Sequence, residues 1–391
     1  MHLTKEEERI YDGESGWANE KCMKILVRLG ELFDAERLIP IESAHVSGVS
    51  YKTLGDAPIE YLKALASNGA ETRVRATLNP HSFDEYLQAK LEPSLQSKQL
   101  DILKQFEKMR FTKSSTCTPY YLEKPSAGSH LAWAESSAVV YANSILGAWT
   151  NREGGPSALA AAIIGKTPEY GIHKPENRAP QVLVRLRTRL RNDIEFGALG
   201  IHLGRVLKDQ IPTVEGIWGA QDDDLKQLCA AAASTGMVNM LQCQEQRATP
   251  TDTAQSVTVG SEDIENTIKD LNTAGEPNPD LVFIGCPHCS LNEIKQVADL
   301  LDGRRVKPET EFWVCTSNYV KEIAKNHVQR IQRSGGHVLA GVCTVVSWTE
   351  ALGIRTIMTN SAKTAYYAPT LNKAETILAT KEDCLKAALR P

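Results

Sequence analysis

Three cysteines stand at or near the ends of apolar segments in the last third of the chain. Cys286 ends the segment LVFIGC, Cys315 lies near the end of EFWVC, and Cys343 ends HVLAGVC. Each segment is typical of a buried strand. Because ligands of open parallel sheets bind beyond the carboxyl ends of the strands, we expect the three thiols at one functional edge. Thiolates at such an edge bind soft metals and iron–sulfur clusters.

A fourth cysteine, Cys117, opens a different kind of segment. It lies in the polar turn TCTPYY, at the start of a block from Thr116 to Arg178 that is rich in small and polar residues. Such a mixture is typical of a site rather than of a scaffold, and Cys117 is a candidate to approach the same edge. Three cysteine ligands on a 4Fe-4S cluster would leave one iron open to act as a Lewis acid on a hydroxyl group.

The cysteines also have plainer interpretations. The chain has nine, an odd number at irregular spacing, which argues against a disulfide framework. Most are expected to be buried small hydrophobic residues, and Cys315, flanked by Trp313 and Val314, fits that description best. Cys286 and Cys289 form a CxxC pair, which is half of a zinc site or a weak redox motif, but no second pair completes a zinc site.

Polar residues after predicted strands and in glycine-rich turns are candidates for holding a substrate. Arg152 can bind a carboxylate or phosphate in a bidentate fork, and the glycines after it let backbone N–H groups approach. The plainer alternative is an exposed loop or an ordinary turn. The full candidate set is Ser43, His45, Ser47, Gly48, Thr77, Asn79, Asn151, Arg152, Glu153, Ser361 and Lys363.

The elements that position these residues alternate between helix and strand. The first half predicts helices over 6–33 (broken near 13–16), 58–67 and 84–111 (broken at Pro93), with strands within 37–46 and 71–78. The middle predicts strands in QVLVRLRTRL, IPTVEGIWG and MVNMLQC, a glycine-interrupted stretch over 192–206 and a helix over 223–234. This alternation favours an α/β architecture.

The last third has the clearest pattern. Helices are expected after Ser261, which can act as N-cap without a full capping box because Ile264 stands where Glu or Gln is needed, over 291–301 and over 319–333. They alternate with the three cysteine-bearing strands and with RTIMTN. The rhythm predicts a parallel sheet with right-handed crossovers.

Bulk properties narrow the function classes. The 391 residues suffice for two or three domains, which we place at 1–115, 116–255 and 256–391. A net charge of −4 argues against a general nucleic-acid or membrane surface. No segment has the roughly 20 apolar residues of a membrane span, and the acidic start MHLTKEEERIYDGE is unlike a signal peptide, so we expect a cytoplasmic protein.

Several long segments resemble the large subunit of the aconitase X family. They are SAHVSGVSYKTLGDAPIEYL, TCTPYY, HLAWAESSAVVYANSILGAWTNREGGPSALAAAI, TPEYGIHKPENR, GCPHCS and TNSAKTAYY, and the resemblance covers nearly the whole chain. It implies a hydro-lyase with an aconitase-like fold of several αβα three-layer domains, mainly parallel sheets and an iron–sulfur centre. The family's cluster ligands map onto Cys117, Cys286 and Cys343, and neither Cys315 nor Cys289 is among them.

The resemblance also implies a partner and a reaction. The length matches a large subunit without a fused small one, so a separate small subunit is expected to supply a serine general base, and the chain alone should be inactive. Archaeal members of the family dehydrate (R)-5-phosphomevalonate to trans-anhydromevalonate 5-phosphate in a mevalonate pathway to isoprenoids. The alternative enzyme is cis-3-hydroxy-L-proline dehydratase. Alternatives of other classes are an iron–sulfur sensor that binds RNA, which the net charge disfavours, and a structural zinc protein.

Three positions depart from the family pattern near the expected site. Trp149 stands in GAWTNREGG where relatives usually have arginine, Ser129 stands where glutamate is common, and Gly341 stands where an acid usually precedes the third cysteine. These departures bear on the substrate more than on the cluster.

Overall fold

The computed structural model describes residues 1–244, 255–276 and 278–390. Contacts divide the chain into two units. Unit 1 comprises residues 1–81 and 91–179, and unit 2 comprises residues 82–90 and 180–391. The three regions expected from the sequence, 1–115, 116–255 and 256–391, stay a prediction. Within the described part of the chain, no helix is long and apolar enough to cross a bilayer.

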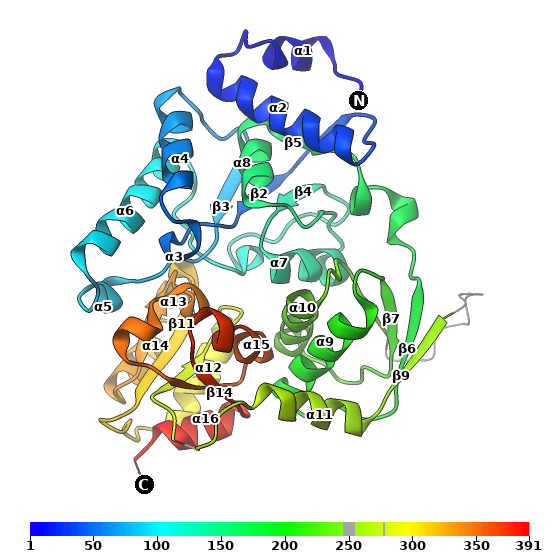
Figure 1. The fold of residues 1–391 in the computed structure, drawn as a ribbon. Helices are drawn as coiled ribbons and strands as arrows, with labels where there is room; N and C mark the ends of the chain where they lie inside the picture. The colour runs from blue at the N-terminus through cyan, green and yellow to red at the C-terminus, as the bar shows by residue number, and fades with distance from the viewer. Residues whose placement is uncertain (245–254, 277, 391) are drawn as a thin grey trace. The chain divides into compact units, whose positions relative to one another are not determined.

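Unit 1 is built on a three-stranded parallel sheet in the order β3-β2-β4, with a short antiparallel pair, β1 and β5, beside it (Figure 1). Its strands are β1 Leu38–Pro40, β2 Ser43–Val46, β3 Arg75–Leu78, β4 Leu131–Trp133 and β5 Lys166–Pro168. Its helices are α1 Lys5–Tyr11, α2 Trp17–Leu32, α3 Tyr51–Leu54, α4 Ala57–Ser67, α6 Pro93–Lys108, α7 Ser136–Tyr141 and α8 Gly155–Ile164.

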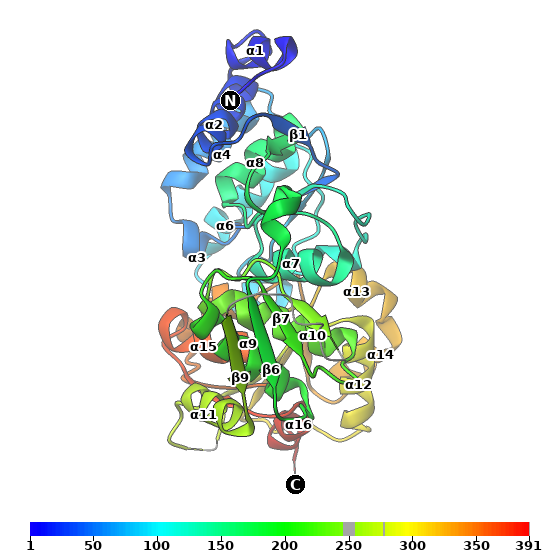
Figure 2. The ribbon, with the colours of Figure 1, turned by 90° about the vertical axis from the view of Figure 1, so that its right-hand side faces the viewer.

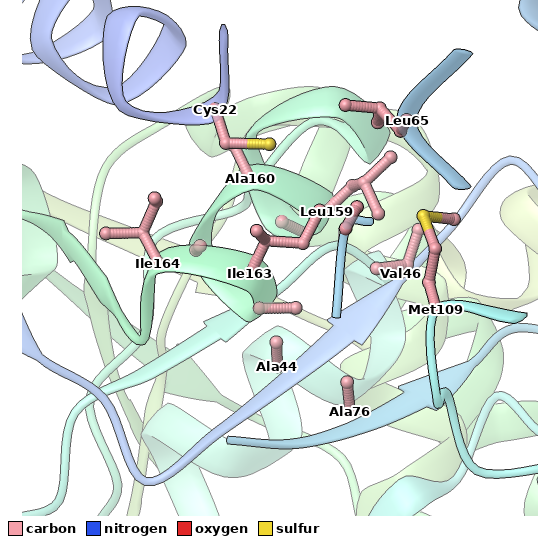
Figure 3. Close-up of a cluster of buried hydrophobic side chains, with 14 of the residues drawn as sticks. Cys22, Ala44, Val46, Leu65, Ala76, Met109, Leu159, Ala160, Ile163 and Ile164 are labelled. Carbon is pink, nitrogen blue, oxygen red and sulfur yellow. The ribbon is translucent and has the colours of Figure 1, made fainter. Parts of the chain in front are cut away.

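The core of unit 1 lies between α8 and this sheet. Figure 3 shows Leu159 and Ile163 of α8 close to Ala44 of β2 and Ala76 of β3, and all four side chains are buried. The small residues of α8 let it lie close to the strands. Cys22 of α2 is buried in the same cluster, and burial raises the pKa of its thiol to about 12, as expected for a core cysteine.

Unit 2 contains two parallel sheets. Strands β6 Val182–Leu186, β7 Pro212–Glu215, β8 Gln242–Gln244 and β9 Gln255–Val259 form one in the order β8-β7-β6-β9 (Figure 2). Strands β10 Leu281–Ile284, β11 Glu311–Thr316, β12 His337–Ala340, β13 Thr356–Thr359 and β14 Glu375–Leu378 form the other in the order β12-β11-β10-β13-β14. The helices are α5 Glu85–Gln88, α9 Asp193–Leu207, α10 Asp222–Thr235, α11 Ser261–Leu271, α12 Leu291–Leu301, α13 Asn318–Ile323, α14 Lys325–Arg333, α15 Ala362–Leu371 and α16 Lys381–Ala388.

The expected α/β architecture with several parallel sheets is confirmed, and four local predictions need correction. The stretch 37–46 holds two strands, β1 and β2, which belong to different sheets. Within MVNMLQC only the last residues join a strand, β8. The glycine-interrupted stretch 192–206 is a helix, α9. Ser261 is the first residue of α11 rather than its cap, because Gly260 is the N-cap residue and Asp263 Oδ2 accepts from its N–H at 2.8 Å.

Candidate functional site

A line of polar side chains runs from the sheet of unit 1 to the start of α7. His45 of β2 lies between Thr77 at the end of β3, 2.7 Å from its Nδ1, and Asn79, whose Oδ1 is 3.3 Å from its Nε2. Asn79 Nδ2 donates to Glu135 Oε2 at 2.8 Å. One neutral tautomer satisfies both ring nitrogens: Thr77 donates to Nδ1 at 2.7 Å in preference to the Ala44 carbonyl at 3.3 Å, Nε2–H donates to Asn79, and Asn79 donates to the carboxylate. Burial lowers the pKa of His45 to about 4, so the neutral ring is the form at physiological pH.

Glu135, which is not among the sequence candidates, joins this line of side chains through Asn79. Its other oxygen, Oε1, caps α7 by accepting from the Ser137 N–H at 3.3 Å and from the Ser137 hydroxyl at 2.8 Å. The signal was present in the sequence, since an acidic residue between a predicted strand and a helix start is a natural N-terminal carboxylate.

The loop after β2 lies beside the glycine pair of the NREGG segment. Gly48 has a φ of +75°, which favours glycine, and a Cβ at Gly155 would lie only 2.8 Å from the Ser47 carbonyl oxygen. The structure therefore brings Ser47 and Gly48 together with the start of α8. Ser43, by contrast, is buried and accepts from Trp133 Nε1 at 3.2 Å, so its hydroxyl supports the core.

Within NREGG, two side chains bind other parts of the chain. Asn151 accepts from the Ile172 N–H at 2.9 Å and donates to the Tyr170 carbonyl at 3.0 Å. Glu153 is buried and accepts from Ser157 and Thr167 hydroxyls at 2.5 and 3.0 Å. Burial raises the pKa of the Glu153 carboxyl.

Arg152, between them, is half-buried, and its backbone forms a bridge with Trp133 of β4. Arg152 thus adds a positive charge to the segment that is bridged to β4.

Trp149, which precedes this segment, packs under an arginine from the end of unit 1. The Arg178 guanidinium lies 4.5 Å from the centre of its ring and donates to the Asn143 carbonyl at 3.2 Å. The ring also meets His130 edge-on, with centroids 5.6 Å apart. Contacts with Arg178 and His130 therefore hold the Trp149 ring in place shortly before the NREGG segment.

Cys117 follows α6 in the chain, and the residue before it is bound to the end of β3. The Thr116 N–H donates to the Leu78 carbonyl at 2.8 Å, and the hydroxyls of Thr116 and Thr118 lie 3.0 Å apart on either side of the cysteine. Cys117 is buried, as a residue of unit 1.

In unit 2, two of the predicted cysteines come together at the carboxyl edge of the second sheet. Cys286 directly follows Gly285 at the end of β10, and Cys343 follows β12. The pKa of Cys343 is raised to about 12, first by burial and then by the neighbouring charge of Cys286, while Lys363 acts in the opposite direction. The two thiols and the ammonium of Lys363 therefore lie within electrostatic reach of one another.

Two other cysteines of this region, Cys289 and Cys315, are joined to each other by a backbone hydrogen bond. Cys315 lies inside β11 and is fully buried, and its carbonyl accepts from the Cys289 N–H at 2.9 Å. Burial raises the pKa of both thiols well above the usual value, as in structural cysteines.

Ser361 and Lys363 stand at the start of α15. Ser361 is the N-cap residue, and its hydroxyl accepts from the Thr364 N–H at 3.2 Å. The residue before it, Asn360, donates to Asp193 at 2.7 Å, and burial raises the pKa of that carboxyl to about 6. Ser361 therefore caps α15, and the half-buried Lys363 carries a positive charge in the first turn of this helix.

The donor chemistry of unit 2 fits a soft metal. Two neighbouring thiols repel each other once both are ionised, so a bound cation is what would hold both as thiolates. Among the described residues no group of three or more His, Cys, Asp and Glu side chains is gathered as a complete metal site. A third ligand would therefore have to be added to Cys286 and Cys343, and Cys117 belongs to unit 1.

Comparison with known proteins gives matches along the whole chain. Family models for the first, second and third domains of aconitase X match residues 1–176, 180–270 and 279–390. A phosphomevalonate dehydratase large subunit from Methanocaldococcus jannaschii is 43% identical, with 99% of this chain and 100% of the relative covered. One from Methanothermobacter thermautotrophicus is 42% identical, with 94% of each covered.

Two further matches complete the comparison. A cis-3-hydroxy-L-proline dehydratase from Pseudomonas aeruginosa is 32% identical, with 98% of this chain and 69% of the relative covered. The crystal structure of Thermococcus kodakaraensis aconitase X in its holo-form superimposes with a TM-score of 0.92 at 40% identity, covering 99% of this chain and 100% of that one.

Proposed function

The chain belongs to the aconitase X family, and from that premise we propose that it is the large subunit of a hydro-lyase that dehydrates (R)-5-phosphomevalonate to trans-anhydromevalonate 5-phosphate. The observation that carries the proposal is the full-length match, at 43% identity, to a phosphomevalonate dehydratase large subunit. The reaction breaks a C–H bond next to the carboxylate and the C–O bond of the tertiary hydroxyl, forms a C=C bond and releases water.

We propose Cys117, Cys286 and Cys343 as the ligands of an iron–sulfur cluster, with 4Fe-4S as the type. When bound through three cysteines, such a cluster supplies an open iron that polarises the departing hydroxyl. The adjacent thiols of Cys286 and Cys343 support two of the three positions.

The remaining groups suit an anionic substrate with two charged ends. Arg152 and Lys363 supply cationic charge for the phosphate and the carboxylate. Asn79 supplies directional hydrogen bonds to the hydroxy acid, and the buried neutral His45, together with Glu135, orients the Asn79 amide. Ser47 and Gly48 add the backbone of a tight turn, where N–H groups approach an anion.

The partner in this proposal is a separate small subunit that supplies the proton-abstracting serine, and the complex is a cytoplasmic heterodimer. Support comes from the matched relatives, which are named large subunits and are covered along their full length. The chain by itself is then expected to bind iron without turnover.

The experiment is anaerobic co-expression of the chain with its small subunit, followed by incubation with phosphomevalonate and analysis of the product by phosphorus NMR. Conversion should require both subunits and iron. Cys117→Ser should lose most of the iron and the activity, whereas Cys315→Ala, which removes a buried thiol of the same sheet, should keep the iron. Full iron content in the Cys117 variant would refute the ligand assignment.

A second candidate is dehydration of cis-3-hydroxy-L-proline, which the match at 32% identity favours. That substrate carries no phosphate and needs fewer cationic contacts. Turnover of both substrates by the same complex, side by side, decides between them: a Lys363→Met variant should lose affinity for phosphomevalonate, and it should affect hydroxyproline less.

A further inference from the structure

The two proposed cluster cysteines of unit 2 follow strands that are not neighbours. Cys286 follows β10 and Cys343 follows β12, and β11 lies between these strands in the sheet. Strands two positions apart are separated by roughly 10 Å. Some part of the chain must therefore cross the end of β11 to hold the two cysteine-bearing segments together.

His288 makes that crossing. It lies two residues after Cys286 and is 1% exposed, and its Nε2 is 2.8 Å from the carbonyl oxygen of Val342, the residue before Cys343. Because a carbonyl can only accept, Nε2 carries the hydrogen and donates it. One buried side chain thus joins the segment of one cysteine directly to the segment of the other.

Lys226 binds the backbone carbonyl of His288. This lysine lies in α10, within the part of the chain that matches the second family domain, whereas His288 belongs to the third. Its ammonium donates to the His288 carbonyl at 3.3 Å and forms an ion pair with Glu293 and another with Asp223 at 3.5 Å. Lys226 is 1% exposed, and an ammonium so deeply buried is stable only when its donors are all used.

The backbone at the end of β11 also contacts the two cysteine-bearing segments. The Cys289 N–H donates to the Cys315 carbonyl at 2.9 Å, and the Thr316 hydroxyl donates to the Cys289 carbonyl at 2.7 Å. On the other flank, the Gly341 N–H donates to the Thr316 carbonyl at 2.9 Å. The backbone at the end of β11 therefore binds both cysteine-bearing segments.

We propose that His288 and Lys226 are positioning residues that hold Cys286 and Cys343 side by side across the end of β11 before any cluster is inserted. Groups behind metal ligands orient the ligands and raise metal affinity. Here His288 and Lys226, together called the brace, would keep the two thiols at the separation that the cluster needs. This inference rests on the proposed cluster for its purpose, but its geometry is testable without iron.

The first test measures thiol proximity in the full-length, iron-free chain. Dibromobimane becomes fluorescent when it links two thiols, and variants Cys286→Ser and Cys343→Ser give the background. His288→Leu should lower the linking yield about fivefold, as expected when one buried hydrogen bond is lost. His288→Gln keeps a donor at a similar distance and should restore most of the yield. A merely structural role for the side chain would not be rescued by the donor alone.

The second test measures iron retention by the complex with the small subunit during challenge with a chelator, followed by the loss of cluster absorbance. His288→Leu and Lys226→Met should each release iron about tenfold faster. Lys166→Met is the matched control, because Lys166 pairs with the buried Glu7 in unit 1 at 2.6 Å, with no link to the cysteines. It should lower the melting temperature without changing iron release or linking.

The outcomes separate the two proposals. Wild-type linking and wild-type iron release in a folded His288→Leu variant would overturn the brace. Linking that depends on His288 in a chain that binds no iron would support the brace and overturn the cluster. If Lys226→Met does not fold, the comparison of His288→Leu with His288→Gln still tests whether His288 holds the two cysteines together.

Discussion

At the scale of single residues, burial sets the protonation states in unit 1. Glu153 is enclosed by the hydroxyls of Ser157 and Thr167, and burial raises the pKa of its carboxyl. His45 is affected in the opposite direction, because burial lowers the pKa of its ring to about 4. Both groups are therefore pushed toward their neutral forms and act as buried hydrogen-bonding groups, while Arg152 carries the positive charge of the NREGG segment.

Glu153 should make the stability of the chain depend on pH. Because its folded pKa lies above the unfolded value of 4.5, its stabilising contribution is fully present below pH 4.5 and declines as the pH rises toward the folded pKa. Each unit of difference corresponds to about 1.4 kcal/mol. Glu153→Gln mimics the protonated form, so its melting temperature, measured by calorimetry from pH 4 upward, should fall less with pH than that of the wild type. Identical slopes would show that Glu153 ionises normally.

Glu135 is expected to matter for activity through Asn79. Removing its carboxylate in Glu135→Ala leaves the Asn79 amide without its acceptor and frees the start of α7. Such a loss behind a binding residue costs about 10- to 100-fold in kcat/KM. Glu60→Gln, an exposed carboxylate paired with Lys63 in the same unit, is the control and should keep wild-type rates. Equal effects of the two changes would contradict the role of Glu135.

The candidate residues could be predicted from the sequence because polar groups and glycines after strands are conspicuous. Their orientation could not. Asn151 and Glu153 stand in the predicted segment, yet they bind backbone and hydroxyl groups that lie 14 to 21 residues further along the chain. The position of Glu135 before α7 is visible in the sequence, but its contact with Asn79 exists only in the folded chain.

At the scale of elements, the glycines of α9 explain how a stretch with poor helix propensity becomes a central helix. Gly200 and Gly204 face α10, and a Cβ on Gly200 would collide with the Leu228 carbonyl and the Ala231 side chain. The alanines of α10 that meet this face are buried. The sequence shows glycines as helix breakers, and only the partner helix turns them into a packing surface. The strands of the last third, by contrast, were predictable because each is a buried apolar run between clear helices.

Gly200→Ala should therefore destabilise unit 2 although alanine favours helices. A methyl group there forces α9 and α10 apart, which costs about 1–3 kcal/mol. Gly275→Ala is the matched control, since a Cβ at Gly275 meets nothing within 4 Å. That change should stay within about 0.5 kcal/mol in denaturant titrations of the full chain. A stabilised Gly200→Ala variant would mean that the two helices can separate at no cost.

At the scale of the whole molecule, the two units are not two consecutive stretches of the chain, because residues 82–90 interrupt unit 1. The match to the first family domain spans residues 1–176, yet residues 82–90 within it belong to unit 2. This short strap, residues 82–90, packs through Tyr86, whose ring stacks on His337 with centroids 3.7 Å apart and whose hydroxyl donates to Glu311 at 2.8 Å. Ser347 donates to the carbonyl of Ser82 at 2.6 Å. The chain thus enters unit 2, leaves it and returns, which local patterns in the sequence cannot reveal.

The strap should stabilise unit 2 and protect itself from cleavage. Tyr86→Ala removes the stacked ring and the bond to Glu311, and it leaves the Lys90 ammonium, now 4.2 Å from the ring centre, with fewer contacts. We expect a loss of about 2 kcal/mol, or roughly 4–8 °C in the melting temperature of a unit of this size.

Tyr319→Ala is the control, because Tyr319 of α13 is 47% exposed; its melting temperature should change by no more than about 2 °C. Limited trypsin digestion gives the local readout, since Lys90 is paired with Glu311 at 2.8 Å and should resist cleavage in the wild type but not in Tyr86→Ala. Equal digestion at Lys90 in both proteins would show that the strap is held by its backbone contacts and not by the tyrosine.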